Sequence, residues 1–265
     1  MRNRKFLVGA GLTVVSLFAM VGVAQAAQTQ TMTASATNTK QDKKVPGGTG
    51  LHVDIKTTYP LGTPAAQSAS HTDLDLPKDF SFVPPAATCN PTQLQGTTTA
   101  AALSLCGASK VGQGVATLCS PVLGCAGTPG GGIPAAVTAF NGVPSGGRPQ
   151  LILHTKPGGV AAATPPTILT GVLVPSPSGA PYGQRLSVTV PDTSSTGFDL
   201  VDFDTTINRI VTRKANKKKH KPAKYYINAK CSTKSWAFKE TTTYNAGGGT
   251  ASASATVACK QKPKK

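Results

Sequence analysis

Alternation of apolar and polar residues with a period of two recurs along most of the chain. In the segment LHVDIKTT, residues 51–58, apolar side chains at the odd positions share one face of an extended strand and polar ones share the other. Similar segments, separated by turns rich in Pro, Gly and Ser, follow at 73–77, 80–82, 110–118, 135–140, 150–156, 167–174, 184–190 and 198–211. Spacing near a dozen residues predicts an antiparallel β-sandwich, jelly-roll-like in kind.

The C-terminal part continues the pattern. A short strand is predicted over 224–230, and segments 234–244 and 250–260 predict a hairpin around the turn 245–249. Trp236, the one tryptophan, and Phe238 fall on the same face of that hairpin. Gly112 and Gly114 share a face of the predicted strand 110–118, which indicates a bulge or the close approach of another backbone.

One segment predicts a helix instead. Asn90 is a favourable N-cap, Pro91 suits the first helical position, and the apolar run 100–105 ends at Cys106 and Gly107. The fold class expected is therefore all-β, with one short helix.

The N-terminal residues have the three parts of a secretory signal. Basic residues come first, an apolar run covers 6–23, and Ala24-Gln25-Ala26 is a small-x-small cleavage site, so we expect a signal peptide over 1–26. An uncleaved anchor is the alternative, because the run approaches the length of a membrane span. We expect 27–50 to be a disordered spacer, 51–260 a single domain, 261–265 a basic tail, and no membrane span after cleavage.

Six cysteines follow the predicted signal, and an even count in an exported chain predicts disulfide bonds. Six cysteines allow 15 connectivities, so the pairing stays open. Proximity in the sequence favours Cys89 with Cys106, Cys119 with Cys125, and Cys231 with Cys259. The first bridge would pin the predicted helix. Cys-x-x-Cys spacing and a nearby set of histidines are both absent, which argues against a zinc site, and no cofactor is expected.

Charge is strongly positive and uneven. The chain has 27 Lys and Arg against 10 Asp and Glu, a formal net charge of +17. The densest basic run consists of Arg213, Lys214, Lys217, Lys218, Lys219, Lys221 and Lys224. Such a run attracts polyanions such as an anionic envelope polymer. The alternative is a solvated loop between two strands, and the lack of aromatic residues among the lysines argues against specific nucleic-acid binding.

Catalytic patterns are sparse. Asp202 and Asp204 would lie on one face of a strand at a separation compatible with glycan hydrolysis or with a calcium site, although a solvated polar face gives the same pattern. No Gly-x-Ser-x-Gly motif occurs, and the four histidines have unrelated contexts. His154 is expected to point from its strand into solvent. The glycine-rich stretch 128–134 is interpreted as a loop, since nothing beside it suits phosphate.

Three stretches of the sequence carry a shared pattern. They are the segment from 75 to 82 leading to Cys89-Asn90-Pro91, the segment from Cys106 through 109–116, and the motif Tyr-x(4)-Cys-x(4)-Trp-x-Phe over 226–238 with the closing Cys259. Together these stretches resemble a set of exported, cysteine-containing proteins of high-GC Gram-positive bacteria. No activity is established for that set. The resemblance implies a secreted β-rich domain and supplies no site. Cys119 and Cys125 lie outside the shared pattern.

From the sequence we expect a secreted, non-enzymatic β-sandwich at or outside the cell envelope, contacting a polyanion through the basic run. The alternative is a jelly-roll hydrolase or calcium-dependent glycan-binding module that uses Asp202 and Asp204. The sequence does not indicate an oligomeric state.

Overall fold

The computed structural model of the chain describes residues 28–58, 68–119, 132–191, 199–211, 224–245 and 248–263. The predicted signal peptide, the basic run from 213 to 221, and Cys125 lie outside these residues. In the part of the chain that is described, no helix is long and apolar enough to cross a membrane.

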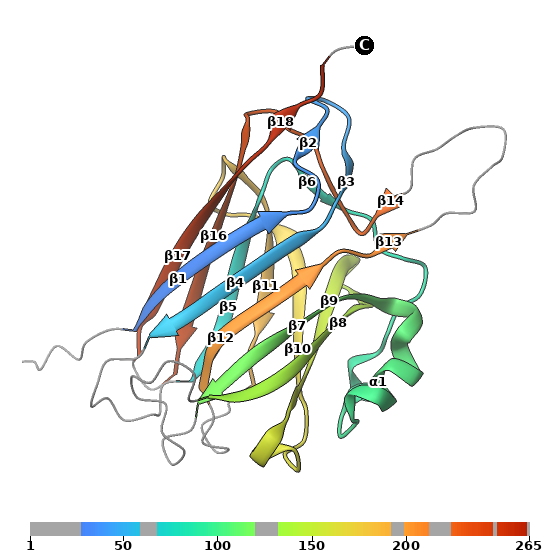
Figure 1. Cartoon of the computed structure of the whole chain (residues 1–265), viewed down its shortest axis with the longest axis vertical. Coiled ribbons are helices and arrows are strands. Elements are labelled where there is room, and N and C mark those ends of the chain that lie inside the picture. Colours follow the sequence, from blue (N-terminus) through green and yellow to red (C-terminus); the bar gives the residue numbers. More distant parts are fainter. Residues whose placement is uncertain are drawn as a thin grey trace, which may run out of the picture.

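One 11-stranded antiparallel sheet forms the body of the protein (Figure 1). Its strands, in spatial order, are β1 (Thr29–Ala36), β4 (Leu51–Thr58), β12 (Asp199–Ile207), β7 (Lys110–Cys119), β8 (Ile133–Ser145), β9 (Arg148–Pro157), β10 (Thr167–Pro175), β11 (Tyr182–Thr189), β5 (Ala69–Pro77), β16 (Ser235–Tyr244) and β17 (Thr250–Ala258). The sheet curls round so that its edge strands β1 and β17 lie side by side. The two halves face each other as a sandwich, which confirms the predicted fold class.

Shorter ladders gather at one end of the large sheet (Figure 1). One ladder has the order β3 (Gly47–Thr49), β15 (Ile227–Ala229), β6 (Phe80–Phe82); the others pair β13 (Ile210–Val211) with β14 (Lys224–Tyr225) and β2 (Lys40–Gln41) with β18 (Lys260–Gln261). All three residues of β15 are buried. These ladders therefore cover that end of the sandwich interior.

The C-terminal hairpin has the predicted face. Trp236 and Phe238 are 1% and 0% exposed, and both rings meet the Phe80 ring edge to face, at centroid distances of 5.1 and 5.5 Å. The indole of Trp236 donates a 2.8 Å hydrogen bond to the carbonyl of Lys230. The adjacent disulfide joins Cys231 to Cys259, as predicted.

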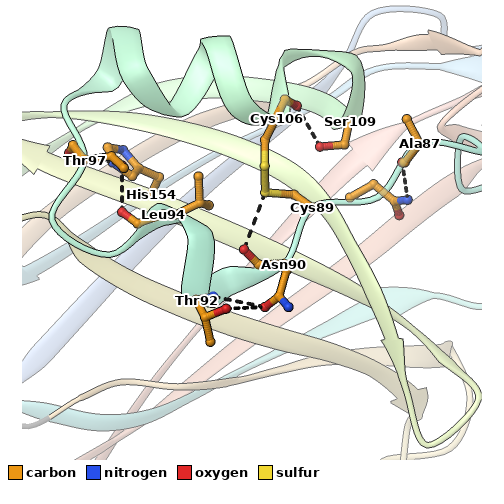
Figure 2. The surroundings of a disulfide bond; sticks show 10 residues. Ala87, Cys89, Asn90, Thr92, Leu94, Thr97, Cys106, Ser109 and His154 are labelled. Atoms are coloured by element: carbon orange, nitrogen blue, oxygen red, sulfur yellow. Dashed lines mark hydrogen bonds between the residues drawn. A yellow bond between two sulfur atoms is a disulfide. The ribbon is translucent and has the colours of Figure 1, made fainter.

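The helical segment is divided in two (Figure 2). Asn90 caps a 3₁₀ turn, η1 (Pro91–Leu94), and Gly96 at φ +68° then turns the chain before Thr98 caps the helix α1 (Thr99–Cys106). A second 3₁₀ turn, η2 (Gly107–Ser109), leads into β7. The predicted Cys89–Cys106 disulfide is present and pins the helix against the sheet. A third 3₁₀ turn, η3 (Gly159–Ala161), follows β9.

The helix explains one wrong prediction. His154 was expected to face solvent, but it is 0% exposed, with Nε2 3.1 Å from the hydroxyl oxygen of Thr97 (Figure 2). Residues of η1 and α1 cover the outer face of β8 and β9 and form a small second core there. Burial lowers the pKa of His154, although a backbone hydrogen bond with Thr97 opposes the shift.

The predicted disordered spacer over 27–50 is also wrong, because its described part begins the domain. Residues 29–36 form β1, which pairs along its whole length with β4, and β2 and β3 follow it. Backbone pairing and the burial of Met32 hold this Thr-rich strand in place. The domain therefore starts before residue 51.

The two glycines of β7 confirm the predicted close approach. A Cβ atom on Gly112 would lie 2.3 Å from the carbonyl oxygen of Thr206, and one on Gly114 would lie 2.0 Å from that of Asp204. Only glycine lets β7 and β12 pair at this distance.

Candidate functional site: an apolar cavity with a buried acid

An apolar cavity of about 140 Å³ lies inside the sandwich. Its walls come from inward-facing residues of strands on both halves of the sheet, including Leu153 of β9, Leu186 of β11 and Phe203 of β12. Leu186 and Phe203 belong to the apolar side chains that are only half-buried, although both point inward. Both residues border this internal space.

The number of strands and the size of their inward-facing side chains together account for the unfilled interior. Side chains meet at the centre of barrels of roughly eight strands, whereas a sheet of more strands encloses a wider space. Here 11 strands surround an interior whose walls are mainly Leu, Val and Ile, with Phe82 and Phe203 as the phenylalanines among the lining residues. These side chains do not fill the space between the two layers, and the cavity is what remains.

A polar cluster lines the same cavity. Glu240 of β16 is 0% exposed, and one of its carboxyl oxygens accepts a hydrogen bond from the hydroxyl of Thr242. Gln30 of β1, with its amide turned to satisfy both ends, donates to Glu240 Oε2 at 2.6 Å and accepts from the hydroxyl of Tyr244 at 3.0 Å. The same amide donates to the carbonyl of Ala251, so it also bridges β1 and β17. The hydroxyl oxygens of Thr72 of β5 and Thr242 lie 2.8 Å apart, at hydrogen-bonding distance.

No cation neutralises Glu240 from within the cavity. The described residues that line it include no Lys, Arg or His, and Glu240 is the one carboxyl group among them. Burial raises the pKa of Glu240 to about 7, and the charge of Asp73 adds to this, while the hydrogen bonds from Thr242 and Gln30 oppose it. Burial likewise raises the pKa of Tyr244 to about 12. The acid thus carries a proton at mildly acidic pH and loses it near neutrality.

Two further polar atoms line the cavity without a protein partner. The hydroxyls of Tyr226 and Thr205 are buried and make no hydrogen bond with the described part of the chain, and the two residues are 1% and 5% exposed. Burial raises the pKa of Tyr226 above its usual range. A buried polar group of this kind is normally satisfied by water or by a bound molecule.

The acidic residues singled out in the sequence lie elsewhere. Asp202 and Asp204 share the outer face of β12, as predicted, opposite Lys56 and Asp54 of β4. A carboxyl oxygen of Asp204 lies 2.8 Å from Nε2 of His52. The amine nitrogen of Lys56 lies 3.4 Å from a carboxyl oxygen of Asp54 and 3.9 Å from one of Asp202. Burial, with a hydrogen bond and the charge of Asp54, raises the pKa of Asp202 to about 6. Within the described residues, no group of three or more His, Cys, Asp or Glu side chains is arranged to hold a metal ion.

The basic run can be placed only by its neighbours. Lys224 begins β14 and pairs with Val211 of β13, so the two described residues on either side of the segment 212–223 lie next to each other. Polyanion binding by the run stays a prediction. Cys119 is disulfide-bonded, and its predicted pairing with Cys125 also stays a prediction because Cys125 is outside the described residues.

Sequence reasoning did not find the cavity cluster. One signal was available. Glu240, Thr242 and Tyr244 lie at every second position after Trp236 and Phe238, so the alternation places them on the same, buried face of the strand. Gln30 could not be found in this way, because it lies in the segment expected to be disordered.

Comparison with known proteins finds no family model, no curated protein and no solved structure that matches this chain. The function must therefore be argued from the residues themselves.

Proposed function

We propose that the protein is a non-enzymatic binding protein that holds a small apolar molecule, or the end of a longer apolar chain, inside its β-sandwich. The observation that carries the proposal is the cavity of about 140 Å³, whose wall surface is almost entirely apolar. A cavity of similar size, roughly 150 Å³ and lined by Leu, Ile and Phe, stays dry and takes up benzene. Binding of this kind recovers dispersion contacts that the empty walls lack.

The unpartnered hydroxyls of Tyr226 and Thr205 support the same proposal. Ligand sites in proteins are mostly apolar, with a few polar groups that fix the orientation of the ligand. Export to an oxidising compartment remains part of the proposal, and the disulfides Cys89–Cys106 and Cys231–Cys259 are compatible with it.

The test is binding of toluene, followed by the melting temperature and by NMR of methyl-labelled protein. We expect a saturable rise in melting temperature, with intermolecular contacts from the toluene ring to the methyls of Leu153 and Leu186. Leu173 lines the cavity, whereas Val174 is the next residue of β10 and faces the other way. Leu173→Trp should therefore weaken toluene binding, and Val174→Trp should leave it unchanged.

Absence of any saturable effect of toluene on the wild-type protein would contradict the proposal. So would equal binding by the two tryptophan variants, provided that both give the wild-type pattern of amide resonances. If Leu173→Trp does not fold, the NMR contacts in the wild-type protein still decide whether toluene occupies the cavity.

A further inference from the structure

Glu240 is a fully buried carboxyl group that lines the apolar cavity, and its negative charge needs a cationic partner when it ionises. Burying a charge is costly unless it is paired, so an unpaired buried carboxyl keeps its proton to a higher pH than an exposed one does. The cavity-lining residues provide hydroxyls and one amide, but no cationic side chain.

The strands packed around Glu240 leave its charge without compensation. Glu240 is hydrogen-bonded to Thr242 of its own strand and to Gln30 of β1. Hydroxyl groups lie around them: Thr72 of β5 is bonded to Thr242, and Thr57 of β4 lies beside Tyr244. β17 carries no ionisable residue. The charged group that acts on Glu240 is Asp73 of β5, whose negative charge opposes the ionisation of Glu240. Arg185 of β11 does not supply a cation to Glu240, because its guanidinium is bound to Asp73 and Asp75.

The carboxyl group also has acceptor capacity to spare. A carboxylate can accept about four hydrogen bonds. The protein donors to Glu240 are the hydroxyl of Thr242 and the amide of Gln30. The remaining acceptor positions are therefore available to a molecule in the cavity, which Glu240 lines.

From this arrangement we infer that the natural ligand is a small primary amine with an apolar body, whose ammonium group pairs with the carboxylate of Glu240 while the body fills the aliphatic cavity. This inference rests on the proposed function. An ammonium has three donors and can bond to the carboxylate and to a neighbouring hydroxyl at once. Pairing with a cation also removes the cost of ionising the buried acid.

The experiment compares benzylamine, benzyl alcohol and toluene, three probes of nearly equal size, by calorimetric titration of the full chain. At pH 7.5 we expect benzylamine to bind at least tenfold more tightly than benzyl alcohol. Because the ammonium needs the ionised acid, the affinity for benzylamine should rise about tenfold per pH unit below the pKa of Glu240 and level off above it. The affinity for toluene should change little with pH.

Glu240→Gln keeps the size of the side chain and removes its charge. We expect it to lower the affinity for benzylamine at least tenfold and that for toluene less than threefold. Asp204→Asn is the matched control, since it removes an exposed carboxylate from the outer face of β12. That variant should bind benzylamine as the wild-type protein does.

The outcomes separate the two proposals. Binding of toluene or benzyl alcohol without preference for benzylamine would overturn the amine inference and leave the proposed function standing. A benzylamine affinity that is independent of pH, or that is equally reduced in Asp204→Asn, would also overturn the inference. Failure of all three probes to bind would contradict both.

Discussion

Replacing Glu240 by Gln should change the pH dependence of folding stability in the absence of any ligand. The carboxyl is fully buried, and its pKa in the folded protein is about 7, against 4.5 for a free glutamate. As pH rises from about 4.5 to 7, the unfolded chain releases this proton while the folded chain keeps it. The folded state then binds more protons, so its free energy of unfolding falls across this interval and is constant above it.

The size of the effect follows from the shift. One pKa unit corresponds to about 1.4 kcal/mol, so a shift from 4.5 to about 7 corresponds to a loss of about 3 kcal/mol by pH 8. Glutamine does not titrate, and its amide oxygen can still accept from Thr242. Gln30 can turn its amide to match the new donor. The variant should therefore equal the wild-type protein near pH 4 and exceed it by up to about 3 kcal/mol at pH 8.

The assay is urea unfolding of both proteins at a series of pH values from 4 to 9, plotted as the difference in unfolding free energy. Asp199 and Asp202, whose pKa values are also raised to about 6, contribute equally to both proteins and cancel in the difference. A difference that stays constant across the pH range would refute the reasoning, because it would mean that Glu240 titrates alike in the folded and unfolded states. A variant less stable at pH 8 than at pH 4, relative to the wild-type protein, would refute its sign.

Three further predictions concern the scaffold and the basic run. Gly114→Ala should destabilise the protein by about 3 kcal/mol in the urea assay, because the new Cβ would lie 2.0 Å from a carbonyl oxygen of β12. Gly107→Ala is the control: the space around its Cβ is open, so the substitution should be neutral or slightly stabilising. Replacing Cys231 and Cys259 together by serine should cost about 3 kcal/mol, because the bridge closes a separation of 28 residues, and thermal unfolding would show little change if the bridge were dispensable. Retention on heparin should fall steeply with salt and should be lost when the lysines of 213–224 are replaced by serine; retention that ignores salt would contradict the polyanion hypothesis.

Many strands after residue 50 could be predicted because apolar residues of their inner face alternate with polar residues of their outer face. The boundaries of β4 and β6, 51–58 and 80–82, agree with those expected from the alternation. β1 was missed because its inward face is marked only by Met32, Ala34 and Ala36 in a Thr-rich sequence. Its order comes from pairing with β4, a tertiary effect that overrides weak local preference.

The candidate site could not be predicted for a related reason. Gln30 and Glu240 stand 210 positions apart in the sequence and meet because the sheet curls until β1 and β17 adjoin. The alternation places Glu240 on the inner face of its strand, but it does not show that the interior is hollow. That property depends on the number of strands and the sizes of the facing side chains together.

Carboxyl groups on the neighbouring strands β5 and β16 differ in whether a cationic side chain is paired with them. On the outer face of β5, Asp73 and Asp75 are each bound by Arg185 at 2.8 Å, and Ser176 and Ser178 donate to Asp75 as well. Burial alone would raise the pKa of Asp75, but these hydrogen bonds and the charge of Arg185 lower it instead. One strand away, Glu240 is equally buried and has no cation, although nothing about a β-strand prevents one from being placed opposite it. Asp73 and Asp75 thus have a cation from the protein, whereas the described residues around the cavity give Glu240 none, and from this contrast we infer that a ligand supplies it.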